Sequence, residues 1–207
     1  IVPDTGYEGA IQACVDAAFD DPKVTAVLRQ VLDAVVAPGR SNALAAKLLD
    51  LTIPGVPDLY QGSELWELNL VDPDNRRPVD FETRTEMLAA VRTGERPPLS
   101  DAPDEDGAAK LLLCHQALTL SRDHPELFTT YVPIEAQGPA AGHLIGFDRG
   151  GGIRLAGGLP VGLAAEGGWR GTWIPLPEGR WRDQISGRRV APDEHGGVLL
   201  GDVFAQY

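Results

Sequence analysis

The sequence predicts an α+β protein in two parts, a mostly helical part over residues 1–124 and an antiparallel β-domain over residues 125–207. Two observations lead to this prediction. In the first part, apolar residues recur at the three- and four-residue spacing of amphipathic helices. From Phe128 onward, short apolar runs alternate with glycine- and proline-containing turns, which is typical of antiparallel strands. We expect these strands to form a β-sandwich.

Three helices are predicted at the start of the chain. The first covers residues 3–19, with Asp4 or Thr5 as a suitable N-cap. The second covers residues 22–36 and opens with proline in its first turn, where the missing N–H costs nothing. Pro38 and Gly39 are expected to end it, since proline disrupts a helix interior. The third helix starts at Ser41 and leads into an apolar segment that begins at residue 51.

That apolar segment can hold only a short strand. Pro54 and Pro57 leave residues 56–61 free to form a buried strand, and Gly62 ends it. With the clear helix predicted over residues 104–123, this gives a helix–strand–helix unit that fits the last unit of a (β/α)8 barrel. A lone parallel strand has nothing to pair with, so within this chain we expect it to be irregular or to pair with another chain.

A long polar loop follows, over residues 69–80, and a short helix is predicted after it over residues 82–92. Carboxylates and guanidinium groups are the acceptors and donors that a hydroxyl-rich or anionic ligand needs. The loop therefore holds candidate site residues: Asp72, Asp74, Arg76 and Arg77. The alternative is that Asp-Pro-Asp-Asn only makes consecutive turns. The spacing of these residues leaves both interpretations open.

Six strands are predicted in the second part, over residues 129–135, 143–147, 153–156, 171–175, 180–183 and 198–200. Residues 149–152, Arg-Gly-Gly-Gly, are predicted to form a hairpin turn between two of them. Trp169, Trp173 and Trp181 could form a sugar-stacking platform. We favour half-buried strand aromatics, which are commoner.

Composition limits the partners and the chemistry. The net charge of −12 argues against nucleic acid and anionic membrane as partners. Because the chain starts at Ile1 and its only methionine is Met87, we expect it to begin inside a longer gene product. Cys14 and Cys114 lie in predicted helices without a CxxC partner, so we expect reduced core thiols in a cytoplasmic protein. The four histidines occur singly, so neither a metal site nor a cofactor is expected.

Two sequence runs resemble a known family. PGVPDLYQGSEL, over residues 54–65, resembles the eighth barrel strand and following loop of the α-amylase superfamily of glycoside hydrolases. Together with LVDPDNRRPVDF, over residues 70–81, it resembles the maltooligosyl trehalose synthases in particular. The resemblance extends to YEGAI, SNALAAKLLDL, LSRDHPELF and GRWRDQISGR, in that order. It implies the C-terminal portion of an enzyme of trehalose biosynthesis.

The family converts the reducing-end α-1,4 linkage of a maltooligosaccharide to an α,α-1,1 linkage by intramolecular transglucosylation. Its catalytic carboxylates follow earlier barrel strands, so the resemblance implies that they lie upstream of Ile1, that no catalytic residue can be assigned here, and that the chain alone is inactive. It implies a maltooligosaccharide-binding wall with Asp72 and Arg76 against glucose units. The full set of implied binding residues is Asp72, Asn75, Arg76, Arg77, Tyr60, Gln61 and Glu64.

Two alternatives remain open at this stage. The chain could be part of a related α-amylase-type hydrolase, or a non-catalytic carbohydrate-binding or structural β-module. Many relatives carry a tyrosine at the position of Gln61, so that residue's role is not carried over from them.

Overall fold

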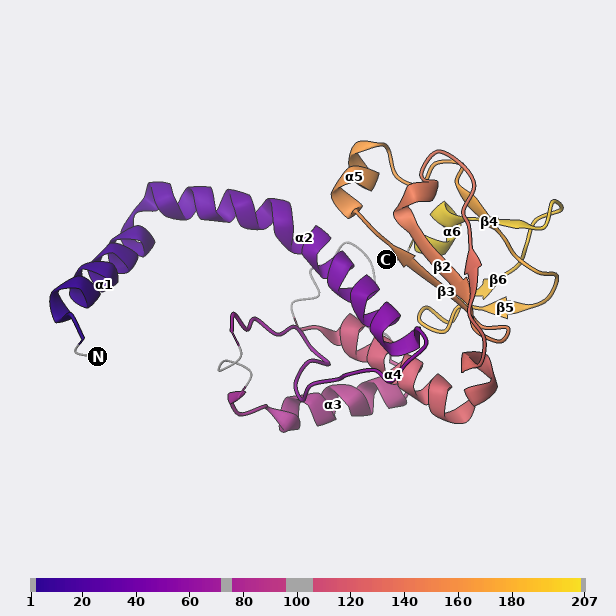
Figure 1. The fold of residues 1–207 in the computed structure, drawn as a ribbon, viewed down its shortest axis with the longest axis horizontal. Helices are drawn as coiled ribbons and strands as arrows, with labels where there is room; N and C mark the ends of the chain where they lie inside the picture. The colour runs from indigo at the N-terminus through magenta and orange to yellow at the C-terminus, as the bar shows by residue number, and fades with distance from the viewer. Residues whose placement is uncertain (1–2, 72–75, 96–105, 206–207) are drawn as a thin grey trace. The chain divides into compact units, whose positions relative to one another are not determined.

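The computed structural model describes residues 3–71, 76–95 and 106–205. The candidates Asp72, Asp74 and Asn75 lie outside the described residues. The chain divides into two compact units, Ile1–Arg40 and Ser41–Tyr207. The helices are α1 (Thr5–Asp20), α2 (Pro22–Thr52), α3 (Phe81–Arg92), α4 (Ala108–Asp123), η2 (Pro125–Phe128), η3 (Ala141–His143), α5 (Pro160–Ala165) and α6 (Leu200–Phe204) (Figure 1).

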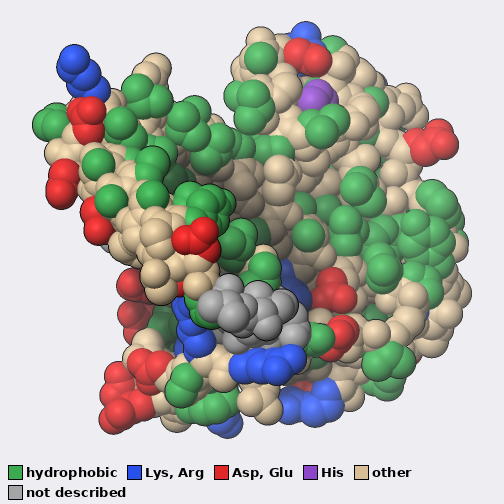
Figure 2. Space-filling model, turned by 60° about the vertical axis from the view of Figure 1, so that its left-hand side comes forward, with side chains coloured by type: hydrophobic (Ala, Val, Ile, Leu, Met, Phe, Trp, Pro, Cys, Tyr) green, Lys and Arg blue, Asp and Glu red, His purple; other side chains and the backbone are tan. Residues whose placement is uncertain are grey.

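The first unit is helical, and in its described residues no side chain is buried. Of the two predicted caps, Asp4 is the one that caps α1, accepting a hydrogen bond from the Tyr7 N–H at 3.0 Å. The apolar stripe of α1 is exposed, with Ile11 at 50% and Val15 at 44%. Figure 2 shows hydrophobic side chains at the surface of the molecule. Cys14 is exposed too, so the prediction of a core thiol at that position is wrong.

The prediction that Pro38 and Gly39 end the second helix is also wrong. α2 continues through both residues to Thr52, so the second and third predicted helices are one. A proline in a helix interior removes one backbone hydrogen bond and costs about 3 kcal/mol, but the turns on both sides keep theirs. The end of α2 is buried, with Leu51 at 5% and Thr52 at 3% exposure, and this packing offsets the local cost.

The helical core of the second unit forms around α4. Leu51 from α2 packs against Cys114 and Ala117 of α4, with Leu59 beside them. α3 packs on α4 as well (Figure 1). Burial raises the pKa of the Cys114 thiol to about 11, so this cysteine is a neutral core thiol, as predicted.

The described residues between α2 and α3 contain no strand. Val56, at the start of the expected strand, is 96% exposed. The expectation of a buried strand is therefore wrong for this chain, and the irregular backbone matches the expectation for an unpaired segment. A parallel strand needs neighbours for its N–H and C=O groups, and this chain offers none there.

The β-domain consists of three small antiparallel sheets. β1 (Val132–Ile134), β2 (Leu144–Asp148) and β3 (Ile153–Gly157) form the first. β4 (Trp173–Pro175) pairs with β7 (Gly197–Leu199), and β5 (Trp181–Arg182) pairs with β6 (Arg189–Val190). All six predicted strands overlap an observed one, and the predicted turn at 149–152 joins β2 to β3. Only β6 was not predicted.

One apolar cluster joins these sheets. Its buried centre is Ile174, Leu176, Val198 and Leu200, and residues from the first and third sheets pack against it. Trp169, Trp173 and Trp181 are all half-buried, as predicted. Trp169 lies outside the strands and stacks on Phe204 of α6, with ring centroids 4.9 Å apart. No helix in the described part of the chain is long and apolar enough to cross a membrane.

Two buried arginines connect the first sheet to the helices. Arg149 donates from Nη1 to the carbonyl of Thr52 at 2.9 Å and from Nη2 to the carbonyl of Phe128. Arg154 donates to the carbonyls of Leu127, at 2.8 Å, and Gly152. Burial, followed by the neighbouring Arg149, lowers the pKa of Arg154 to about 10. The β2–β3 hairpin is thereby attached to the end of α2 and to η2.

We expect Arg149→Lys to lower the free energy of unfolding by about 2–4 kcal/mol, because an ammonium group lacks the fork that reaches two carbonyls and a buried acceptor is left unpaired. Urea denaturation measures this. The matched control is Arg122→Lys, whose side chain is 73% exposed and paired with Asp123. It should change stability by less than about 0.5 kcal/mol. Equal effects of the two substitutions would contradict the structural role of Arg149.

Candidate functional site

The candidate site is the segment between α2 and α3, and its first fixed feature is a turn around Gly62. The Ser63 N–H and hydroxyl both donate to the Tyr60 carbonyl, at 3.0 and 2.8 Å. Gly62 has φ +94°, and a Cβ there would lie 2.9 Å from Glu67 Oε1 and 3.2 Å from Val79. Both the conformation and the space therefore require glycine.

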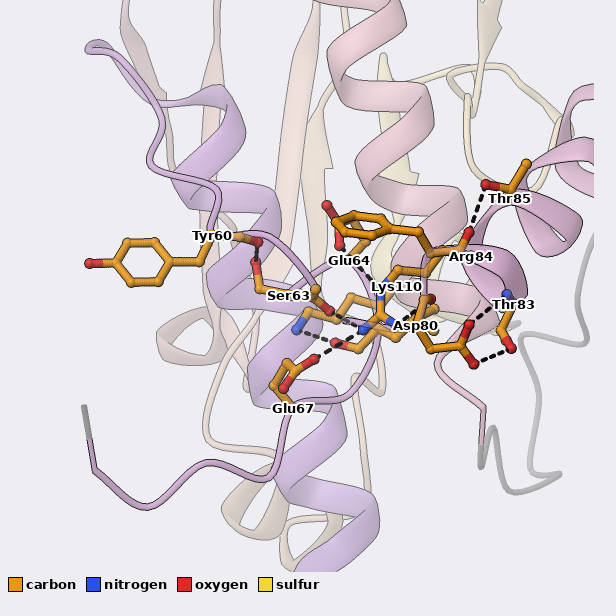
Figure 3. A network of polar contacts seen from close by, with 12 residues as sticks. Tyr60, Ser63, Glu64, Glu67, Asp80, Thr83, Arg84, Thr85 and Lys110 are labelled. Atoms are coloured by element: carbon orange, nitrogen blue, oxygen red, sulfur yellow. Dashed lines mark hydrogen bonds and ion pairs between the residues drawn. The ribbon is translucent and has the colours of Figure 1, made fainter. Parts of the chain in front are cut away.

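Arg84 of α3 binds this turn. Its Nη2 donates to the Gly62 carbonyl at 2.7 Å and to Glu67 Oε1 at 3.0 Å. Its Nε lies 3.6 Å from Glu64 Oε2, an ion pair longer than a hydrogen bond. Figure 3 shows these groups converging on one guanidinium. The two glutamates thus supply the negative charge that this largely buried cation needs.

The same arginine also binds the other end of the segment. Arg84 Nη1 donates to the Asp80 carbonyl at 3.0 Å. Asp80 is the N-cap of α3 and accepts from the Thr83 N–H and hydroxyl, at 3.1 and 2.6 Å. The hydrogen bond from the Thr83 hydroxyl is the main cause that lowers the pKa of Asp80. A single side chain therefore holds together residues 62 and 80, on either side of the polar loop.

Lys110 of α4 contacts the backbone directly after this turn. It is 9% exposed, donates from Nζ to the Leu65 carbonyl at 2.9 Å and lies 5.5 Å from the centre of the Trp66 ring. Burial lowers its pKa, and the nearby Glu67 and Glu64 act in the opposite direction. The amine is thus partly desolvated but held in place by a carbonyl and an aromatic face.

The predicted site residues fall into two groups around this framework. Tyr60 is 60% exposed, and Figure 3 shows its ring pointing away from the Arg84 network. Gln61, Arg76 and Arg77 are also exposed. Glu64, in contrast, is half-buried and faces Arg84. The first four side chains are therefore accessible to solvent, while Glu64 contributes to the framework.

Sequence reasoning did not identify Arg84 and Lys110. A lysine within the apolar run over residues 108–114 was a usable signal, because a buried cation requires partners. Arg84 gave no such signal, since an arginine on a polar helix is ordinary. Among the described residues, no group of three or more histidine, cysteine, aspartate or glutamate side chains could hold a metal ion.

Comparison with known proteins finds chains that are similar to this one. No protein-family model matches it. It is 41% identical over 187 residues to a Mycobacterium tuberculosis protein assigned as a maltooligosyl trehalose synthase, covering 89% of this chain. A solved structure of maltooligosyltrehalose synthase from Arthrobacter ramosus matches the whole chain at 47% identity, with a TM-score of 0.89. The chain is a relative of the maltooligosyl trehalose synthases.

The chain spans only part of these maltooligosyl trehalose synthases, 22% of the Mycobacterium protein and 26% of the Arthrobacter chain. A Sulfolobus tokodaii structure of the same assignment shares the fold over 94% of this chain, with a TM-score of 0.66 at 24% identity. The resemblance carried by the runs at residues 54–65 and 70–81 is thereby confirmed.

Gly62→Ala tests the turn, with Gly94→Ala as its matched control. Gly94 has φ +92°, and a Cβ there would meet nothing within 4 Å, so the control carries only the backbone strain, about 1–2 kcal/mol. At Gly62 the added Cβ also displaces Glu67 and Val79, so we expect a further loss of about 1–3 kcal/mol. Urea denaturation of both variants gives the difference. Equal losses in the free energy of unfolding of the two variants would mean that the turn accommodates the added Cβ without steric strain.

Proposed function

We propose that this chain is the C-terminal part of a maltooligosyl trehalose synthase, an intramolecular transglucosylase of trehalose biosynthesis. The supporting observation is the 47% identity with the Arthrobacter enzyme over the whole chain. Such an enzyme would convert the reducing-end α-1,4 linkage of a maltooligosaccharide to an α,α-1,1 linkage. We further propose a cytoplasmic location, in keeping with two free cysteines.

The proposed architecture is the last helix–strand–helix unit of a (β/α)8 barrel over residues 1–124, followed by a β-sandwich over residues 125–207. Two features support it. The apolar faces of α1 and of the first half of α2 are exposed in this chain, as are residues of the expected strand such as Val56. Both would be explained if the remaining three quarters of the enzyme packs against them.

In this proposal the chain binds sugar but does not cleave it. Retaining glycosidases use two carboxylates about 5–5.5 Å apart, as nucleophile and acid. These would come from the part of the enzyme outside this chain. Asp72, Asn75, Arg76 and Arg77 would bind glucose hydroxyls, because carboxylate and guanidinium can each make paired hydrogen bonds. Tyr60 and Gln61 would contact sugar, and Glu64 would act through Arg84.

Transfer of a glucosyl unit to the released sugar, and not to water, depends on how the acceptor is held and on excluding water. Fixed ends of the loop would contribute to both. Arg84 fixes residues 62 and 80 before ligand arrives, which reduces the ordering cost on binding.

A product assay tests the function. We expect the full-length enzyme to convert maltopentaose to a product without a reducing end, with little release of glucose, and this chain alone to give no product. Reducing-sugar loss and glucose release measure the two reactions. Glucose or shorter maltooligosaccharides as main products would indicate a hydrolase. Inactivity of the full-length protein, with micromolar sugar binding by this chain, would favour a carbohydrate-binding module.

The loop residues are tested separately. In the full-length enzyme, Arg76→Ala and Asp72→Ala should each lower kcat/KM on maltopentaose about 5- to 150-fold, the equivalent of losing about 1–3 kcal/mol per unpaired hydroxyl. Arg122→Ala, at an exposed arginine of α4, serves as control and should leave kcat/KM unchanged. Unchanged kcat/KM with a lowered Tm would mean that the loop residues only form turns.

A further inference from the structure

The β5–β6 hairpin has a pairing that is unfavourable by itself. Its register places Trp181 opposite Val190 and Arg182 opposite Arg189. Trp181 and Val190 pack on the apolar cluster of the β-domain, so the two arginines face the other side of the ribbon. Directly opposed side chains have Cβ atoms about 4.5–5.5 Å apart, and like charges at that spacing are destabilising. Figure 1 shows the two strands side by side.

Arg180 joins this pair. It is two residues from Arg182 and lines the same cavity. Within the described part of the chain, no hydrogen bond or ion pair reaches the guanidinium group of Arg180, Arg182 or Arg189. The neighbouring carboxylate of Asp183 accepts instead from the Ile185 and Ser186 N–H groups, at 2.9 and 3.2 Å. Among the described residues, these three cations therefore have no ion pair, although Arg189 also lines a second cavity with Asp183 and Asp202.

Two other arginines of this region do have partners. Arg188 donates to the Asp202 carbonyl at 3.4 Å, and Arg170 pairs with Glu166 at 3.4 Å. Arg188 follows the strand alternation and lies on the opposite side from Arg189. The three arginines without partners are thus a distinct group, on one face of one hairpin.

The arginine-bearing face of the β5–β6 hairpin contains a cavity. Arg180, Trp181, Arg182, Gly187 and Arg189 line an open cavity of about 390 Å³. The Trp181 indole is held in place, since its Nε1 donates to the Pro177 carbonyl at 2.9 Å. Small-molecule sites have volumes of about 300–1,000 Å³, so the cavity suits a ligand larger than one phosphate group and far smaller than a polymer.

We propose that this cavity binds a phosphate monoester of hexose size, with the phosphate between Arg182 and Arg189 and in reach of Arg180. Guanidinium groups carry donors only, and they bind phosphate oxygens in a bidentate manner. A neutral sugar could accept hydrogen bonds from the three arginines through its hydroxyl oxygens, but it would leave their positive charges uncompensated. A dianion satisfies the donors and removes the repulsion between the opposed arginines, and the volume of the cavity leaves room for a sugar ring beside the phosphate.

Calorimetric titration of the full-length protein tests this, with inorganic phosphate, glucose 6-phosphate and neutral maltotriose as probes at constant ionic strength. Both phosphates should bind, glucose 6-phosphate more tightly. Arg182→Gln/Arg189→Gln should weaken glucose 6-phosphate binding at least tenfold. Arg170→Gln/Arg122→Gln, which removes the same two positive charges outside the cavity, should leave it unchanged. Binding of inorganic phosphate as tightly as glucose 6-phosphate would exclude a role for the sugar and point to free phosphate as the ligand.

Several results would overturn the proposal. These are no phosphate binding, equal binding by the double variant, or loss of maltotriose binding in that variant, which would indicate a neutral glucan site. Thermal unfolding shows whether a loss of ligand binding is caused by a folding defect of the variant. Because the substitution removes repulsion, Tm in phosphate-free buffer should stay equal or rise, and glucose 6-phosphate should raise the Tm of the unsubstituted protein only. A lowered Tm without ligand would show that the arginines are structural.

Discussion

The contacts of Arg84 are the constraint on which the candidate site depends. A desolvated guanidinium is costly unless its donors and its charge are matched, and in Arg84 only Nε lacks a hydrogen bond, since it faces Glu64 at the longer distance of 3.6 Å. Here the Gly62 and Asp80 carbonyls take two donors, and Glu64 and Glu67 supply the charge. The conformation of the turn, the cap of α3 and the position of the two glutamates are therefore mutually dependent. The side chains of Tyr60 and Gln61 are exposed beside this framework.

Local chemistry predicted much of this fold. Glycine and proline separate the apolar runs of the β-domain, so six strands and the turn at 149–152 could be located from the sequence. β6 was missed because Arg189–Val190 is too short to show alternation. The end of the second helix was misplaced because the rule for proline considers only the local backbone, whereas the buried residues at the end of α2 hold the helix together past Pro38.

The site was harder to predict for a related reason. Tyr60, Gln61, Glu64 and the loop residues were found through a resemblance between sequences, which says nothing about contacts. Arg84 reaches the Gly62 carbonyl across 22 residues, and Lys110 reaches Leu65 across 45. Periodicity and turn chemistry operate over a few residues and carry no information at such separations. The exposure of Cys14 shows the same limit, since an apolar stripe indicates that a face can be covered but not what covers it.

The hydrogen bond from Arg149 to the Thr52 carbonyl joins residues 97 apart in sequence. Every residue of the candidate site lies within the length of chain that this bond closes. The carbonyl belongs to the last residue of α2, where the negative end of the helix dipole lies, so a cation delivered by the β2–β3 hairpin acts as the cap of that helix. Closing so long a segment is entropically costly and comes late in folding. The segment between α2 and α3 is therefore closed at its start by a hydrogen bond from a hairpin to whose sheet its described residues contribute no strand.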